Sequence, residues 1–151
     1  MKKLLTILML AVAVIAVAPT AYAKTKKKAK STSSASWNGD IPSASLILKM
    51  RGSSKGISSN IVSQLKQHGY KITREDSGDF WYEATWTKSG VCSISYFDGV
   101  EAADSGWEIE VYNSAACTKL YNDLRNKLRT DKNWDVSKEG SKISIFYSEF
   151  K

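Results

Sequence analysis

Residues 107–129 have the sequence WEIEVYNSAACTKLYNDLRNKLR, in which the spacing of the apolar residues changes from two to between three and four. Trp107, Ile109 and Val111 stand at every second position, which is the period of a strand with one apolar face. The alternate positions are Glu, Glu and Tyr, so we expect the other face of this strand to meet water. The stretch therefore predicts a half-exposed strand that runs directly into a helix.

The helix is predicted from residue 114 to residue 129. Its apolar stripe consists of Cys117, Leu120, Tyr121, Leu124 and Leu128. Asn113 or Ser114 is the expected N-cap, because a short polar side chain accepts a hydrogen bond from the first turn. Basic residues in the last turn complement the helix dipole. One face of this helix should therefore pack on a sheet.

The rest of the chain is predicted from the same two periods. We expect a strand at 43–51, a helix at 55–68, strands at 70–74, 80–88 and 91–97, and a hairpin at 134–150. In the first of these strands Leu46, Leu48 and Met50 alternate with other residues. Gly69 follows the first helix and supplies a left-handed cap.

The order of these elements suggests an internal repeat. Residues 45–86 and 107–150 both follow the order strand, helix, strand, turn, strand, with strand 91–97 between them. This pattern predicts a degenerate βαββ duplication. The fold class is α+β, with two helices packed on one face of a largely antiparallel sheet of about six to seven strands.

Residues 1–23 have the form of a secretory signal peptide. Lys2 and Lys3 precede an apolar stretch that Pro19 ends, and an Ala-x-Ala sequence finishes at Ala23. We expect cleavage after Ala23 and a periplasmic or secreted protein. The alternative is an uncleaved inner-membrane anchor, because lysines just after the apolar stretch favour keeping that side in the cytoplasm.

The basic charge of the chain is concentrated in a tail at residues 24–36, which we expect to be disordered ahead of a single domain at 37–151. The lysines of this tail are Lys24, Lys26, Lys27, Lys28 and Lys30. Without them and without Lys2 and Lys3, 15 of the 22 basic residues remain, against 15 acidic residues. A neutral domain argues against nucleic acid as a partner. The tail is either a contact for an anionic envelope surface or a solvated linker.

The chain has two cysteines, Cys92 and Cys117. Cys92 shares a strand face with Ile94 and Tyr96, and Cys117 lies on the apolar stripe of its helix, so both should face the same layer. In an oxidising compartment we expect them to form a disulfide, worth about 3 kcal/mol for a loop of this length. Two separate buried thiols are the alternative.

The aromatic residues give the candidate binding surface. In the strand FWYEATWTK at residues 80–88, one face consists of Phe80, Tyr82, Ala84 and Trp86. If this face is buried, Trp81 and Glu83 lie on the opposite face, which meets water. Tyr112 also falls on the wet face of its strand. We take Trp81, Glu83 and Tyr112 as candidate partner-binding residues, because exposed Trp and Tyr are typical of protein interfaces. A second layer of packing over Trp81 is the alternative.

No motif indicates a catalytic residue, a cofactor or a metal. His68 is the single histidine, and with two cysteines the chain has fewer than the four ligands of a structural zinc site. We therefore expect an exported, non-enzymatic binding module for an unidentified protein partner, of the inhibitor, immunity or envelope accessory kind. The alternatives are an envelope- or polyanion-binding protein held by the lysine tail and a small secreted hydrolase.

Overall fold

A computed structural model describes residues 36–51, 56–99 and 104–148. The chain divides into two units, Met1–Lys30 and Ser31–Lys151, and all described residues belong to the second. The predicted signal peptide and the five lysines of the tail lie outside the described residues. The elements of the fold therefore all belong to the second unit.

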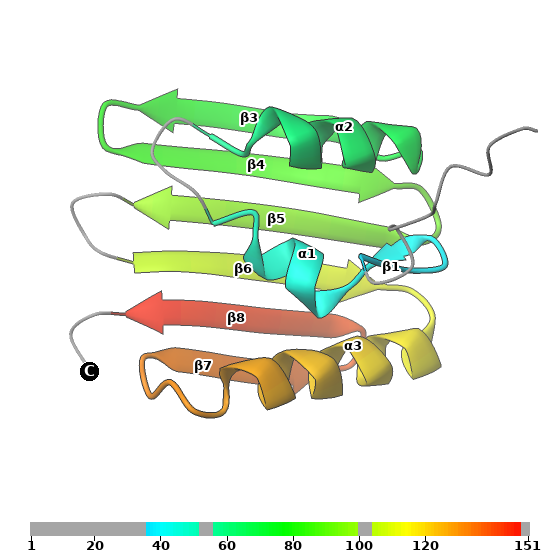
Figure 1. Cartoon of the computed structure of the whole chain (residues 1–151). Coiled ribbons are helices and arrows are strands. Elements are labelled where there is room, and N and C mark those ends of the chain that lie inside the picture. Colours follow the sequence, from blue (N-terminus) through cyan, green and yellow to red (C-terminus); the bar gives the residue numbers. More distant parts are fainter. Residues whose placement is uncertain (1–35, 52–55, 100–103, 149–151) are drawn as a thin grey trace, which may run out of the picture. The chain divides into compact units, whose positions relative to one another are not determined.

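Six antiparallel strands form the main sheet (Figure 1). In spatial order they are β3 (Lys71–Gly78), β4 (Trp81–Lys88), β5 (Cys92–Gly99), β6 (Asp104–Val111), β8 (Lys142–Ser148) and β7 (Trp134–Glu139). A separate two-stranded sheet pairs β1 (Trp37–Asn38) with β2 (Ile41–Pro42). The predicted α+β class is confirmed.

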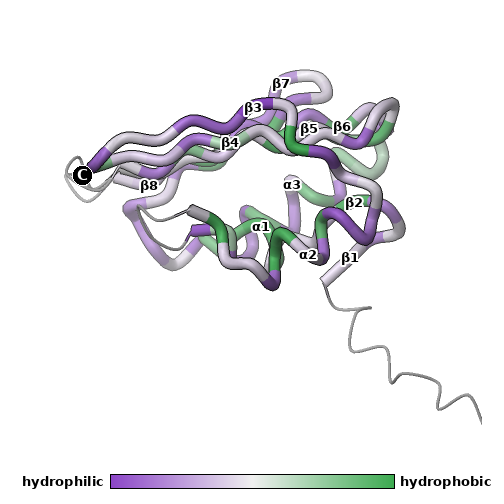
Figure 2. The backbone as a smooth tube through the Cα atoms, turned by 90° about the horizontal axis from the view of Figure 1, so that it is seen from above, coloured by the Kyte–Doolittle hydropathy of each residue, from purple (hydrophilic) through white to green (hydrophobic). Residues whose placement is uncertain are grey.

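The described residues contain three helices, α1 (Ala44–Leu48), α2 (Ser59–Gln67) and α3 (Ser114–Leu128), and all of them lie on one side of the main sheet (Figure 2). In Figure 1, α2 lies over β3 and β4, whereas α3 lies at the β8–β7 side. The buried side chains between the two layers all fall between Trp37 and Ile145. The described residues therefore contain a hydrophobic core.

The prediction for residues 43–51 is wrong, because this segment contains the helix α1 and no strand of the sheet. Ser43 caps the helix, since its Oγ accepts a hydrogen bond of 3.3 Å from Leu46 N. The buried residues that share a helical spacing here are Ala44, Ile47 and Met50. A short apolar run is compatible with the period of a strand and with that of a helix. Here the N-cap at Ser43 favours the helix. The count of two helices is wrong for the same reason.

The helix predicted at residues 114–129 corresponds closely to α3. α3 begins at Ser114, and the Asn113 side chain accepts a hydrogen bond of 2.9 Å from Ala116 N, as a cap should. The strand before it is longer than expected and begins at residue 104. The first predicted helix is shorter than expected, because α2 begins at Ser59.

The predicted disulfide is absent, and both cysteines are free and buried. Cys117 points to the β7–β8 turn, where its Sγ donates to the carbonyl oxygen of Ser141 at 3.4 Å. Cys92 begins β5, which is separated from β8 by β6. Burial raises the pKa of the Cys92 thiol to about 11 and also raises the pKa of Cys117. The alternative of two separate buried thiols is the correct one here.

Candidate functional site

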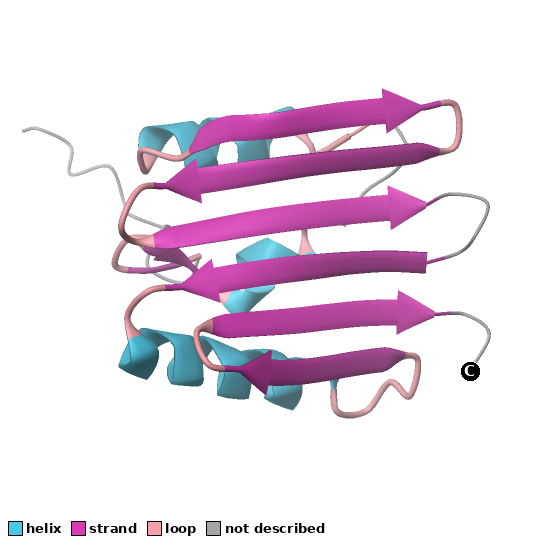
Figure 3. Ribbon diagram, turned by 180° about the vertical axis from the view of Figure 1, so that it is seen from behind, coloured by secondary structure: helices cyan, strands magenta, loops and turns pink. Residues whose placement is uncertain are grey.

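The side of the main sheet away from the helices, which we call the open face, carries no helix among the described residues (Figure 3). Directly opposed residues of an antiparallel pair point to the same face, so the register assigns each strand residue to one side. Trp81, Glu83, Thr85 and Thr87 alternate with buried residues of β4, so these four lie on the open face. Their cross-strand partners extend this face from β3 to β7.

The centre of the open face is a hollow above a glycine. Gly106 of β6 is paired with Phe97 of β5 and with Phe146 of β8. The two phenylalanines are 41% and 45% exposed. Because Gly106 has no side chain, a hollow of about 460 Å³ lies among these residues, and Arg74 and Glu108 help to line it. An apolar projection of another molecule would fit between the two rings.

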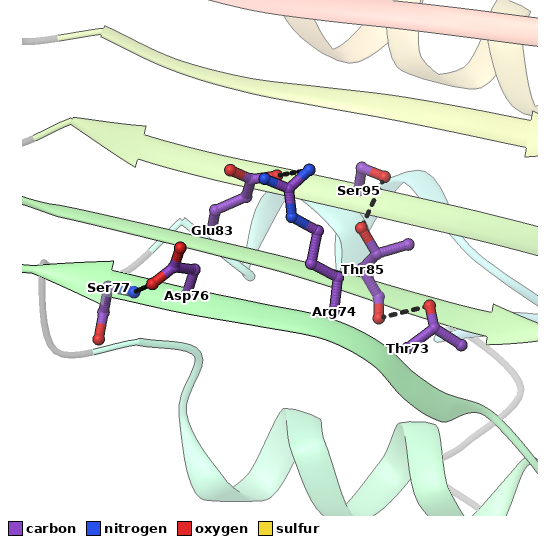
Figure 4. A network of polar contacts seen from close by, with 7 residues as sticks. All are labelled: Thr73, Arg74, Asp76, Ser77, Glu83, Thr85 and Ser95. Carbon is purple, nitrogen blue, oxygen red and sulfur yellow. Dashed lines mark hydrogen bonds and ion pairs between the residues drawn. The ribbon is translucent and has the colours of Figure 1, made fainter.

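Short hydroxyl side chains occupy the part of the open face beside the hollow. Thr85 Oγ1 and Ser95 Oγ are 3.0 Å apart, and Thr87 Oγ1 and Ser93 Oγ are 3.1 Å apart. Thr73 continues the row, because its Oγ1 lies 3.2 Å from Thr87 Oγ1 and also donates to the carbonyl oxygen of Thr85 (Figure 4). These side chains form hydrogen bonds with one another across strands. Because they are short, this part of the open face does not project outwards.

The open face is acidic. The register gives it carboxylates from four strands: Asp76, Glu83, Glu108, Glu110, Asp135 and Glu139. Its cations by the same register are Lys71, Arg74 and Lys142. Arg74 Nη1 lies 3.0 Å from Glu83 Oε1, so this pair neutralises itself (Figure 4). Among the residues whose side chains the structure describes, these six carboxylates outnumber the three cations by three.

The three predicted binding residues are only partly together. Trp81 and Glu83 lie two residues apart on the open face of β4, as expected. Trp81 is half-buried, because its indole lies against Gly78 on β3. Tyr112 is 54% exposed, but it follows the end of β6 that pairs near Thr87, six residues along β4 from Trp81. That separation is about 20 Å, so Tyr112 belongs to the other end of the sheet.

Sequence reasoning missed the two phenylalanines that border the hollow. The alternation of Cys92, Ile94 and Tyr96 already assigns the following Phe97 to the opposite face, so its position could have been found. Phe146 alternates in the same way with Ile143 and Ile145. No local signal shows that Gly106 lies between the two phenylalanines, because their proximity depends on β6 lying between β5 and β8 in the sheet.

The single histidine lies outside the open face. His68 is stacked on Trp37, with ring centroids 3.6 Å apart and an interplanar angle of 7°. Within the described ranges, no three or more His, Cys, Asp and Glu side chains are grouped so that they could hold a metal ion. In the same ranges no helix has the length and apolar character needed to cross a bilayer.

The comparisons with known proteins assign no relative to the chain. No family model matches it, and neither a curated protein nor a solved structure is significantly similar to it. The function must therefore be inferred from the open face and from the distribution of charge.

Proposed function

We propose that this protein is an exported, non-enzymatic binding module whose open face docks on a protein partner, as an inhibitor, immunity-type or envelope accessory protein would. The observation that carries the proposal is the hollow at Gly106 between the exposed rings of Phe97 and Phe146. Aromatic side chains around a central recess are the typical anchor points of protein interfaces. The hydroxyl row and the charged residues around them supply a polar rim.

The size of the open face favours a macromolecule over a small ligand. Six strands with a spacing of about 4.8 Å are about 29 Å wide, and eight residues of a strand are about 26 Å long. The product is on the order of 750 Å², close to the roughly 800 Å² that each partner buries in a standard interface.

The negative charge of the open face favours a partner with a basic surface. The excess of carboxylates on the open face, two of which (Glu83 and Glu108) line the hollow beside Arg74, favours a protein with a basic surface and an apolar side chain at its centre. Electrostatic attraction of this kind raises the association rate and is weakened by salt. The partner should therefore bind faster at low ionic strength.

A duplication of a βαββ unit is also part of this proposal. The orders α2–β3–β4 and α3–β7–β8 are the same, β3 and β7 are the two edge strands, and β4 and β8 are their inner neighbours. β5 and β6 then pair at the centre of the sheet. The first unit has α1 where the repeat would need its leading strand, so the duplication is at best incomplete in that half.

Export rests on residues 1–23, with their charged start, apolar stretch and Ala-x-Ala end. Mass spectrometry of the protein that cells accumulate tests it. A mature N-terminus at Lys24 would support export with cleavage, whereas an intact N-terminus in the membrane fraction would support the anchored alternative.

Capture of the partner tests the main proposal. Residues 24–151 would be immobilised as the native sequence, as Phe97→Ser/Phe146→Ser, and as the control Phe80→Ser, which changes a phenylalanine that is 52% exposed in the β3–β4 turn. A true partner is retained by the native and control proteins and is lost from the double variant. It is then purified, and its affinity for all three proteins is measured by calorimetry. A partner that binds the double variant as tightly as the native protein would rule out the open face.

A further inference from the structure

The two layers of the described part carry opposite charge. Residues 43–51 and 56–68, which include α1 and α2, contain Lys49, Arg51 and Lys66 and no carboxylate. The open face on the other side of the sheet has an excess of carboxylates. The net charge of residues 31–151 is near zero although the helix layer is basic and the open face of the sheet is acidic.

The third helix and the turn after it add as much net positive charge again. Residues 114–133 contain Lys119, Arg125, Lys127, Arg129 and Lys132, all exposed, against Asp123 and Asp131. Lys119 Nζ lies 3.2 Å from Asp123 Oδ2, so this pair is neutral. Arg125 lies over the ring of Tyr121 at 5.7 Å. Among the described residues, Lys127 and Arg129 form no ion pair with a carboxylate.

A recess between α1 and α3 lies beside these cations. It has a volume of about 370 Å³, and Ser45, Asn126 and Lys127 help to line it, together with Asp123, whose carboxylate is paired with Lys119. Hydroxyl, amide and ammonium groups are all donors to phosphate oxygens. The recess thus offers donors to the headgroup of a phospholipid, and the ion pair with Lys119 offsets the negative charge of Asp123.

The start of the described chain also lies on the helix side. Trp37 of β1 packs on His68 at the end of α2, and Lys119 Nζ of α3 donates to Asn38 Oδ1 at 3.2 Å. In Figure 2, β1 lies at the same level as the helices and away from the open face. The described residues therefore begin on the basic side.

We propose that the helix layer, through Lys127, Arg129 and their neighbours, binds the surface of a membrane that contains anionic phospholipid. The helix layer and the open face are opposite sides of two packed layers, so membrane contact leaves the open face free (Figures 2 and 3). Each cation near such a surface contributes up to about 1 kcal/mol of binding free energy. Salt screens this attraction over a Debye length of about 8–10 Å, so binding should weaken as salt is added. This site is independent of the protein partner proposed above.

Vesicle sedimentation tests the helix layer separately from the lysine tail. The protein is residues 24–151 with the five tail lysines replaced by Gln, which retains every described core residue. Vesicles of phosphatidylcholine are used with and without phosphatidylglycerol, at low and at physiological salt. Lys127→Gln/Arg129→Gln is compared with Lys71→Gln/Lys142→Gln, which removes the same charge from the open face. Circular dichroism and thermal unfolding show that both variants are folded.

The tail-neutral protein is expected to bind only vesicles that contain phosphatidylglycerol. The helix-layer variant should bind them roughly ten- to thirtyfold more weakly, and the open-face variant should change by less than about twofold. Equal losses in both variants would show that net charge alone matters and would overturn the proposal. So would the absence of any vesicle binding once the tail lysines are replaced, or binding to heparin with none to vesicles.

Discussion

The ring of Phe146 on β8 leans over Gly106 on β6, since Phe146 Cδ2 lies 3.6 Å from the position that a Cβ on Gly106 would occupy. Trp81 on β4 has the same relation to Gly78 on β3, because a Cβ on Gly78 would meet the Trp81 indole. In both pairs an aromatic ring lies against a cross-strand glycine, a known way to stabilise glycine in a sheet, and at Gly106 the ring of Phe146 forms one side of the hollow. The open face therefore holds its aromatic rings in place through contacts within the sheet.

Gly106→Ala should weaken partner binding more than it changes stability. The new Cβ would lie 3.1 Å from the carbonyl oxygen of Ile145, so the strand must shift slightly, while the loss of glycine favours the strand. We expect the free energy of unfolding to change by less than about 1 kcal/mol and the affinity for the partner to fall roughly tenfold. Urea denaturation and calorimetry measure the two effects.

Gly140→Ala is the matched control. Gly140 lies in the β7–β8 turn with φ +56°, and nothing lies within 4 Å of its Cβ position. The left-handed backbone should make alanine cost about 1–2 kcal/mol without any change in binding. If Gly106→Ala binds the partner like the native protein, the hollow is not the binding site.

Trp86→Ala and Trp81→Ala should differ strongly in stability although both residues lie on β4. Trp86 is 2% exposed and faces the helices, so its loss leaves a cavity and should cost about 3–5 kcal/mol. Trp81 lies on the open face over Gly78, and its loss should cost about 1 kcal/mol. Equilibrium denaturation in urea distinguishes them, and a cost for Trp81→Ala as large as that for Trp86→Ala would mean that Trp81 is a core residue.

The ion pair between Arg74 and Glu83 should contribute little to stability. Its atoms are 3.0 Å apart, but the two side chains are 64% and 27% exposed, so water screens the pair. We expect the coupling energy from a double-mutant cycle of Arg74→Gln and Glu83→Gln to be below about 1 kcal/mol. A coupling energy of several kcal/mol would contradict this description of an exposed pair.

The free energy of unfolding should fall as the pH rises from 9.0 towards about 11, because of the Cys92 thiol. Burial raises the pKa of its thiol from 9.0 to about 11, so the unfolded chain loses this proton at a lower pH than the folded protein. The thiol then stabilises the fold below pH 9, and this contribution is lost as the pH rises towards 11. At pH 10 the loss should be about 1.4 kcal/mol.

Cys92→Ala is the control for this titration. The variant should be less stable at pH 8, but its free energy of unfolding should fall less steeply towards pH 10. Tyr82 is common to both proteins and is not coupled to Cys92, so its ionisation cancels in the comparison. The pKa of Tyr70 is raised mainly by burial and in smaller part by Cys92, so Tyr70→Phe is introduced into both proteins. Parallel pH curves for the native protein and the variant would show that Cys92 does not cause the change.

Local signals in the sequence were enough for most of the elements. The change of period near residue 113 and the cap at Asn113 locate α3 within one residue. The alternation in β4 correctly separates Trp86 from Trp81. The same reasoning failed at residues 43–51, where the apolar run is too short to favour either period and α1 forms on a cap at Ser43.

The disulfide prediction failed for a different reason. Burial of Cys92 and Cys117 in one layer was correct, but a shared layer does not bring two sulfur atoms together. The position of α3 near β7 and β8 directs Cys117 to Ser141. That position follows from packing between elements far apart in the sequence.

The sequence by itself determined the α+β class, the wet and buried sides of individual strands, and the absence of net charge from residues 31–151, because these depend on local period and composition. Only the tertiary structure decided what stands side by side. The strand order brings Phe97, Gly106 and Phe146 together across three strands, and it separates Tyr112 from Trp81. Packing all three helices on one side also turns a neutral composition into a basic layer and an acidic one, because long-range contacts choose each element's neighbours.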